Sequence, residues 1–190
     1  GRHRCWRPAA GARAMEKVEV EPGLAAYVGG ERGRPGVVCL QEWWGITTEV
    51  LGLAQRLAGE GFRVLVPDLY NGKLGLDKEE AAHLMGNLDW VQAKDRMCQC
   101  AAWLKAEGCP SVGATGFCMG GALSLIAAQH SDAVSCAAPF YGTPGRELCQ
   151  PETIKKPIEG HFGELDENAG FSDPGTAGEL QQQLGEGGGG

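Results

Sequence analysis

The sequence predicts one α/β domain in which a mostly parallel central sheet is covered by helices on both faces. Runs that are apolar throughout alternate along the chain with helix-forming runs, a pattern typical of parallel strands buried on both faces. The 190 residues are enough for one domain with a core, and neither an internal repeat nor a linker divides them. We therefore expect a single sheet, with function collected at the carboxyl ends of its strands.

The elements follow in regular order. Pro22-Gly23 separates two short apolar runs, so the chain is expected to open with a hairpin over 18–20 and 24–28. Apolar runs predict further strands at 36–41, 63–66, 111–115, 133–139 and 156–162. Helical spacing predicts helices at 48–60, 76–85, 88–105, 122–128 and 176–184. The helix over 88–105 is amphipathic, with Trp90, Met97 and Trp103 as its expected core anchors.

Composition excludes several partners and cofactors. The net charge of −7 argues against a nucleic acid or an anionic membrane surface as partner. The sequence contains no apolar run of 18 residues, so no membrane-spanning helix is expected. The eight cysteines include no C-x-x-C pair and no zinc-like Cys/His spacing. We therefore expect free thiols in a reducing, cytoplasmic setting, and neither a metal nor a cofactor.

The two ends of the chain differ from the domain between them. Residues 1–14 hold four arginines and no acid, and the first methionine is Met15. They are expected to be a disordered leader, which either has no targeting function or is the remnant of a plastid or mitochondrial transit peptide. Residues 185–190 are glycine-rich and expected to be disordered. The α/β domain is therefore expected over 15–184.

The hexapeptide Gly116-Phe117-Cys118-Met119-Gly120-Gly121 has the G-x-C-x-G pattern of a nucleophile elbow, with cysteine in place of the commoner serine. In an elbow a sharp strand-to-helix turn holds the nucleophile in a strained conformation, and Gly116, Gly120 and Gly121 are needed where a Cβ would strike a neighbour. The dipole of the following helix would favour a thiolate at Cys118. The alternative is a buried cysteine in a glycine-rich turn, and the absence of a following Gly-Lys-Ser/Thr excludes a P-loop.

Polar residues follow the expected strands at their carboxyl ends. They are Glu42, Asp68, Cys118, Tyr141 and Asp166. In an elbow enzyme the triad acid follows the nucleophile in the chain, so Asp166 is the predicted acid, Glu164 is its competitor, and a solvated carboxylate is the alternative. The backbone N–H groups of Trp43 and Met119 are the predicted oxyanion hole. Otherwise the tryptophans only cap the core and Glu42 is solvated.

Several motifs in order resemble the dienelactone hydrolase (carboxymethylenebutenolidase) family of α/β-hydrolases over about Met15 to Leu184. They are Gln41–Gly45, Val66–Tyr70, Gly116–Gly121, Tyr141–Gly142 and Gly160–Asp166. The resemblance implies an α/β-hydrolase fold and a Cys-His-Asp triad that opens a small ester or enol-lactone without a metal. It makes Cys118 the nucleophile, Asp166 the triad acid and Glu42 the carboxylate that helps to generate the thiolate. Trp44, Tyr70, Tyr141 and His161 are the expected pocket residues.

The sequence departs from the family pattern in two places. No histidine follows Asp166, where the triad histidine is expected, so we expect the last strand and helix of the fold to be missing from this sequence. His161 could approach the site from a strand end, whereas His83 and His130 lie on expected helices. The stretch Lys78–His83, where the resemblance places a substrate-binding arginine, contains none. Two other functions therefore remain open: an inactive family member without the triad histidine, and a thiol redox sensor through Cys118. The sequence places no obvious resolving cysteine for such a sensor, although Cys39 could be near in space.

Overall fold

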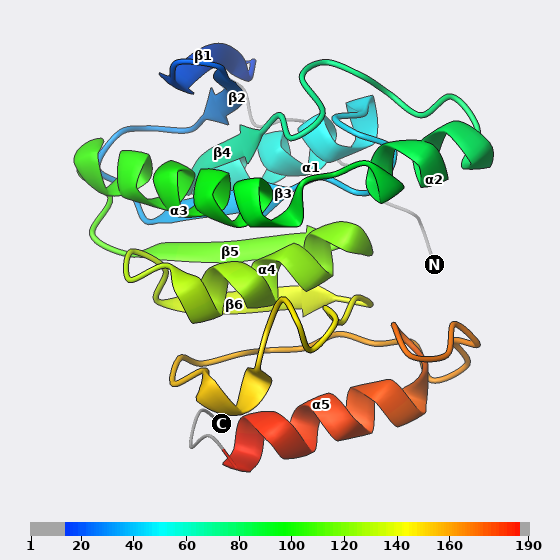
Figure 1. The fold of residues 1–190 in the computed structure, drawn as a ribbon. Helices are drawn as coiled ribbons and strands as arrows, with labels where there is room; N and C mark the ends of the chain where they lie inside the picture. The colour runs from blue at the N-terminus through cyan, green and yellow to red at the C-terminus, as the bar shows by residue number, and fades with distance from the viewer. Residues whose placement is uncertain (1–13, 187–190) are drawn as a thin grey trace, which may run out of the picture.

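The computed structural model of the chain describes residues 14–186, which form one sheet with helices on both faces (Figure 1). The expected leader, apart from Ala14, and the last four residues of the expected tail lie outside this range. The strands are β1 (Glu16–Glu21), β2 (Leu24–Gly29), β3 (Gly36–Leu40), β4 (Arg63–Pro67), β5 (Val112–Phe117) and β6 (Cys136–Phe140). The helices are α1 (Thr48–Gly59), α2 (Lys78–Gly86), α3 (Trp90–Ala106), α4 (Met119–His130) and α5 (Pro174–Glu186), with a short 3-10 turn at Pro151–Thr153.

The predicted α/β class is confirmed by the strand order β1-β2-β4-β3-β5-β6. Strands β4, β3, β5 and β6 are parallel, and the β1–β2 hairpin continues the sheet in the antiparallel sense beside β4. Because the parallel strands share one direction, the chain leaves β3, β4, β5 and β6 at the same edge of the sheet. In Figure 1 this is the right-hand edge, where α4 begins.

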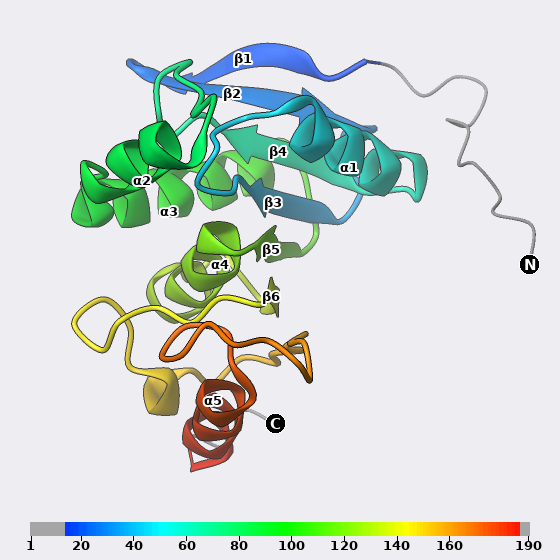
Figure 2. The same ribbon diagram turned by 90° about the vertical axis from the view of Figure 1, so that its right-hand side faces the viewer.

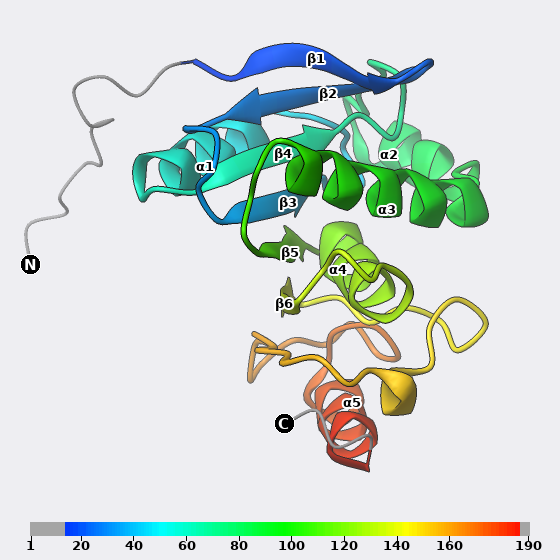
Figure 3. The same cartoon turned by 90° about the vertical axis from the view of Figure 1, so that its left-hand side faces the viewer.

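Each face of the sheet has its own core. Figures 2 and 3 show α1 on one side of the sheet and α3 and α4 on the other. On the α1 side, Cys39, Val64 and Val66 pack with Val50 and Ala54 of the helix. On the other side, the larger core joins apolar side chains of the sheet to α3 and α4. It includes Leu40, Leu65, Met97, Leu104, Leu123 and Ile126. Alternate side chains of one strand therefore serve different cores, as the two-residue period of a strand requires.

Side chains at the helix starts explain why α1, α2 and α3 begin close to where the sequence predicts. Thr47 Oγ1 accepts the N–H of Val50 at 3.4 Å, Asp77 Oδ1 that of Glu80 at 2.9 Å, and Asp89 Oδ1 that of Gln92 at 2.9 Å. Each such cap satisfies one backbone donor that the helix leaves unpaired and is worth about 1 kcal/mol.

The expected strand over 156–162 is present only as an extended segment. It runs parallel to β6 through two isolated bridges, Ala137 to Ile158 and Phe140 to His161. Four backbone hydrogen bonds of 2.8–3.1 Å link the two segments. Pro157 has no N–H to donate, and Gly160 has no side chain to pack, which explains the irregular pairing. The segment nevertheless covers the outer edge of β6.

Three smaller features complete the fold. Gly185 and Glu186 belong to α5, so the expectation that the tail begins at 185 is wrong by two residues. The helices of residues 14–186 are all too short or too polar to cross a membrane. The seven cysteines in this range are all free.

Candidate active site

Cys118 occupies the turn between β5 and α4 with a left-handed backbone, φ 54° and ψ −120°. Within residues 14–186 only three non-glycine residues have a positive φ, namely Asn71, Cys118 and Tyr141. Such a conformation costs of order 1–3 kcal/mol and persists only where the surrounding structure enforces it. The geometry is that of the expected nucleophile elbow.

The elbow glycines are required by close backbone approach. A Cβ on Gly120 would lie 2.5 Å from the carbonyl oxygen of Leu40, and one on Gly116 would lie 2.6 Å from the carbonyl carbon of Gly120. A Cβ on Gly121 would strike the carbonyl of Phe140. The start of α4 is thus wedged between the ends of β3 and β6, which holds Cys118 above the edge of the sheet.

The surroundings of Cys118 favour the neutral thiol. Burial of the side chain is the largest influence and raises the pKa of the thiol. The N–H of Met119 donates to the sulfur and lowers the pKa, whereas the charges of Glu42 and Asp166 raise it further. The resting thiolate expected from the helix dipole is therefore opposed by burial and by two carboxylates.

Glu42 and Tyr141 face each other across the site. The hydroxyl of Tyr141 donates to Oε1 of Glu42 at 3.4 Å. Burial is the main cause that raises the pKa of Glu42, and the bond from Tyr141 partly offsets it. Burial and the nearby Glu42 charge together raise the pKa of Tyr141 to about 12. Glu42 is half-buried, which excludes the alternative of a freely solvated carboxylate.

The predicted oxyanion donors are the backbone N–H groups of Trp43 and Met119. Among the described residues no backbone acceptor takes the N–H of Trp43, and the N–H of Met119 faces the sulfur of Cys118. The ring of Trp43 packs against the core and meets Trp44 edge to face, with centroids 5.0 Å apart. Tyr70 donates to the sulfur of Met119 at 3.3 Å, and both burial and Cys118 raise its pKa. Tyr70 therefore lies beneath the elbow.

Of the two candidate acids, Asp166 is the one that acts on Cys118. Its side chain is half-buried, and its charge contributes to the raised pKa of the thiol. Its Oδ1 accepts the N–H of Asn168 at 2.9 Å. Glu164 is exposed. Asp166 is thus the nearer of the two carboxylates in its effect on Cys118, and its role as the triad acid stays a prediction.

His161 and Asp68 do not join this group. The ring of His161 stacks on Phe140 with a centroid distance of 4.3 Å, and its Nε2 lies 3.6 Å from Glu159. In the described part of the chain no histidine is among the groups that shift the pKa of Cys118. Asp68 is buried and lines a separate cavity of about 490 Å³ with Lys17, Glu19 and Asn71.

Two residues that support the site were not identified as functional from the sequence. Gln41 is fully buried, and its Oε1 accepts the N–H of Leu69 at 3.1 Å, which ties the loop after β3 to the loop after β4. A glutamine that ends an apolar run is the signal that could have found it. Gly142 lies where any Cβ would strike the carbonyl of Cys118, so this glycine also allows the elbow to form.

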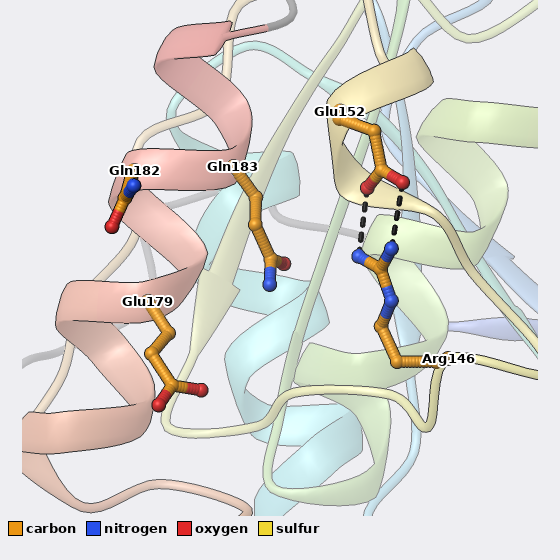
Figure 4. Close-up of a pocket in the computed structure, with 5 residues that line it drawn as sticks. All are labelled: Arg146, Glu152, Glu179, Gln182 and Gln183. Carbon is orange, nitrogen blue, oxygen red and sulfur yellow. Dashed lines mark hydrogen bonds and ion pairs between the residues drawn. The ribbon is translucent and has the colours of Figure 1, made fainter.

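A second surface cavity, of about 330 Å³, lies between α5 and residues 146–152, which lead into the 3-10 turn (Figure 4). Arg146 and Glu152 form two hydrogen bonds of 2.7 Å there, opposite Glu179 and Gln183. None of its lining residues belongs to the Cys118 group. Within residues 14–186 no set of three or more His, Cys, Asp and Glu side chains is arranged to hold a metal ion.

Comparison with known proteins identifies the family of the chain. The sequence model described as the dienelactone hydrolase family matches residues 24–185. Protein usf of Aquifex pyrophilus is 35% identical over 149 residues, which cover 71% of this chain and 63% of that protein. Carboxymethylenebutenolidase 1 of Cupriavidus pinatubonensis is 27% identical over 144 residues, covering 70% of this chain and 61% of that protein. The chain therefore spans less than two thirds of the length of these curated relatives.

The fold has close relatives among solved structures. A dienelactone hydrolase-like promiscuous phosphotriesterase from metagenomic libraries superimposes with a TM-score of 0.78 at 22% identity, covering 93% of this chain and 78% of that one. The match of the family model over most of the chain carries the assignment, and the shared fold agrees with it. This chain belongs to the dienelactone hydrolase family.

Proposed function

We propose that the chain hydrolyses small esters or enol-lactones through an acyl-enzyme on Cys118. The observation that carries the proposal is the left-handed conformation of Cys118 at the start of α4, where the backbone N–H of Met119 donates to its sulfur. Strain of this kind is held in place at sites where a side chain must be presented to a ligand. A buried structural cysteine would gain nothing from it.

The proposed reaction begins with the thiol. Glu42, whose raised pKa makes it a better base than an ordinary carboxylate, accepts the thiol proton as the sulfur attacks the carbonyl carbon. The carbonyl oxygen becomes an oxyanion beside the N–H groups of Trp43 and Met119. The carbon–oxygen bond then breaks, the leaving oxygen takes the proton from Glu42, and a thioester remains. Water cleaves the thioester, releases the acid and returns a proton to the sulfur.

The second half of this sequence lacks a strong base among the described residues. A histidine usually activates the water in a triad, and none acts on Cys118 here. We therefore expect acylation to outpace deacylation. The same observation favours a second candidate, a family member that has lost turnover.

The redox alternative receives less support. Cys39, the cysteine that could have lain near Cys118, is fully buried in the core on the α1 side of the sheet, and burial raises its pKa to about 12. Met119, which follows Cys118, packs in the core on the other side. A sulfenate on Cys118 would therefore have no resolving thiol in Cys39.

Rapid mixing with p-nitrophenyl acetate tests the proposal. We expect one equivalent of p-nitrophenol in a burst, a slower steady rate, and an acetyl group on Cys118 in the mass spectrum. Cys118→Ala should abolish both phases. Cys136→Ala is the matched control, because Cys136 is exposed but begins β6, at the sheet edge opposite Cys118. A burst without turnover would identify the inactive member, and equal rates for all three proteins would refute the nucleophile.

A further inference from the structure

The loop after β4 contains a tight turn over residues 70–73. The N–H of Lys73 donates to the carbonyl of Tyr70 at 3.3 Å. Both central residues have a positive φ, 53° at Asn71 and 83° at Gly72, as a type I′ turn requires. Asn-Gly is a favoured pair in such turns, because both residues tolerate this conformation. Both are exposed, so the turn presents an Asn-Gly peptide bond to solvent.

An asparagine side chain is chemically labile beside such a peptide bond. The backbone nitrogen of the next residue can attack the side-chain carbonyl carbon, which closes a succinimide ring. The bond from that carbon to the side-chain nitrogen breaks, and ammonia leaves with the proton of the attacking nitrogen. Water then opens the ring at either carbonyl and gives aspartate or isoaspartate, without oxidation or reduction. The reaction needs a backbone nitrogen that is neither hindered nor engaged in a hydrogen bond.

The chain contains three asparagines, all within the described residues, and they differ in the N–H group that follows them. The N–H of Gly72, after Asn71, has no backbone acceptor in this part of the chain. The N–H after Asn87 donates to a backbone carbonyl at 3.2 Å, and the N–H after Asn168 does so at 2.9 Å. The side chain of Asn87 is also held, by the carbonyl of His83 at 2.8 Å. Asn71 alone therefore precedes an unengaged nitrogen.

The space around Gly72 is open. A Cβ built on this residue would have only Oδ2 of Asp68 within 4 Å, at 4.0 Å, its chain neighbours aside. Asn71 and Gly72 also line the cavity of about 490 Å³ described above. Neither the attack of the nitrogen nor the entry of water is therefore blocked from this side.

The same loop is joined to the candidate active site at two points. The hydroxyl of Tyr70 donates to the sulfur of Met119, beneath the elbow, at 3.3 Å. The N–H of Gly75 donates to the carbonyl of Trp44 at 3.0 Å. Isoaspartate directs the main chain through the former side chain of Asn71 and lengthens it by a methylene carbon. A longer chain between these two points cannot keep the geometry of the turn.

We propose that Asn71 is a site of spontaneous deamidation, and that its isoaspartate product loosens the loop beneath the nucleophile elbow. The basis is the unengaged N–H of Gly72, the exposed side chain of Asn71 and the two contacts that join the loop to the site. Aspartate, the other product, keeps the length of the main chain and adds only a charge. The inference goes beyond the proposed hydrolase function and needs no turnover at Cys118.

Incubation of the full chain in water enriched in heavy oxygen, at mildly alkaline pH, measures the reaction. Each converted asparagine exchanges an amino group for an oxygen from the water, and peptide mass mapping after an acid quench reports all three sites. We expect conversion at Asn71 to be at least about tenfold faster than at Asn87 or Asn168, a barrier difference of about 1.4 kcal/mol. The rate should rise with pH, because the deprotonated nitrogen attacks.

Ala169→Gly is the matched control. It gives Asn168 the same neighbour as Asn71, whereas the N–H of residue 169 stays engaged by the carbonyl of Glu167 at 2.9 Å. Asn168 in this variant should still convert severalfold more slowly than Asn71. Equal rates at the two would show that glycine alone sets the reaction, and the structural argument would fail.

Two further results would overturn the modification site. The first is equal conversion of the three asparagines in the folded chain. The second is conversion of Asn71 only after unfolding in urea, because the turn would then protect the side chain rather than expose it.

The effect on the loop is measured on the isoaspartate form after chromatographic separation from the unmodified chain. We expect the N–H of Gly75 to exchange with solvent severalfold faster in this form. Alkylation of Cys118 by iodoacetamide should also become faster relative to that of the exposed Cys136. Asn71→Asp carries the charge without the longer main chain and should leave both rates unchanged.

An isoaspartate form with unchanged exchange at Gly75 would refute the link between the modification and the site. Failure of the hydrolase proposal would look different. A chain that never turns over p-nitrophenyl acetate can still convert Asn71 and loosen the loop. A chain that hydrolyses esters but keeps Asn71 intact would retain its function and lose this inference.

Discussion

Glu42 is a residue whose burial opposes folding. Its pKa is raised from 4.5 in the folded protein, so the folded state holds the proton more tightly than the unfolded chain. Stability is therefore lost as the pH rises from about 4.5 through the raised folded value. Glu42→Gln can still accept the bond from Tyr141 but carries no charge. We expect it to raise the urea midpoint at pH 7 and to have no such effect below about pH 4.

A stability gain that persists unchanged at low pH would contradict this account, because it would show that packing rather than charge is responsible. The expected gain also has a functional meaning. A carboxylate that lowers the stability of the fold indicates a functional role in the site rather than a structural one.

Gly120 tests the elbow itself. A Cβ at this position would meet the backbone oxygens of Leu40 at 2.5 Å and Gln41 at 2.8 Å, and neither can move without displacing the end of β3. We expect Gly120→Ala to lower the free energy of unfolding by about 1–3 kcal/mol and to change the alkylation rate of Cys118.

The matched control for Gly120 is Gly52, in the middle of α1, where an added Cβ meets nothing within 4 Å. Gly52→Ala should stabilise the protein by up to about 1 kcal/mol, through helix propensity alone. If both variants had the same effect on thermal unfolding, the elbow would not be as tightly packed as described.

At the scale of elements, α2 and α3 begin in the same way but differ in what they bury. Asp77 and Asp89 both cap a helix through a bond of 2.9 Å. Helix α2 buries only Ala81, whereas α3 buries five side chains, Met97 and Leu104 among them. Loss of the cap of α3 should therefore destabilise the whole molecule, whereas loss of the cap of α2 should destabilise that helix alone.

We expect Asp77→Ala to cost about 1 kcal/mol locally, so that amide exchange in α2 speeds up severalfold while the global urea midpoint stays unchanged. Asp89→Ala should instead lower the global stability by about 1 kcal/mol. Hydrogen exchange resolved by residue distinguishes the two. A global midpoint that moves with Asp77→Ala would show α2 to be part of the cooperative core.

The elements were readable from the sequence because their signals are local. Apolar runs predicted the named strands, and helical spacing predicted the helices to within a few residues. The sequence predicted a regular strand over 156–162, whereas the structure has an irregularly paired extended segment there. Pro157 and Gly160 interrupt the hydrogen bonding to β6, and this effect appears only once β6 lies beside the segment. The elbow could likewise be predicted, since one hexapeptide contains it.

At the scale of the whole molecule, the sequence could not show how the site residues meet. Glu42 and Tyr141 are 99 positions apart, and their bond exists only because β3, β5 and β6 end at one edge. The same assembly decides the protonation of Cys118, where burial outweighs the helix dipole that the local sequence suggested. It also places Asp68 in the lining of a separate cavity and stacks the ring of His161 on Phe140. Local patterns predict which residues stand at the edge, and packing decides which of them touch.

The opposite edge of the sheet carries an ion pair that holds distant segments together. Arg63, at the start of β4, donates to Glu107, after α3, at 2.8 Å and to the carbonyl of Gly30 at 2.7 Å. Both charged side chains are only 12% exposed. Glu107→Gln would leave Arg63 as a nearly buried cation without its counter-ion. We expect the free energy of unfolding to fall by about 1–3 kcal/mol, measured by urea at constant m-value.

Glu152→Gln is the matched control for this pair. Glu152 also forms charge-assisted bonds with an arginine, at 2.7 Å, but its partner Arg146 is 58% exposed, so water can replace the lost contact. It should cost less than Glu107→Gln. Because Glu107 lies at the edge away from Cys118, its loss should also leave alkylation of Cys118 unchanged under folding conditions. Equal losses from the two variants would mean that the Arg63–Glu107 pair is as well hydrated as a surface pair, and that the two edges of the sheet do not divide stability from chemistry.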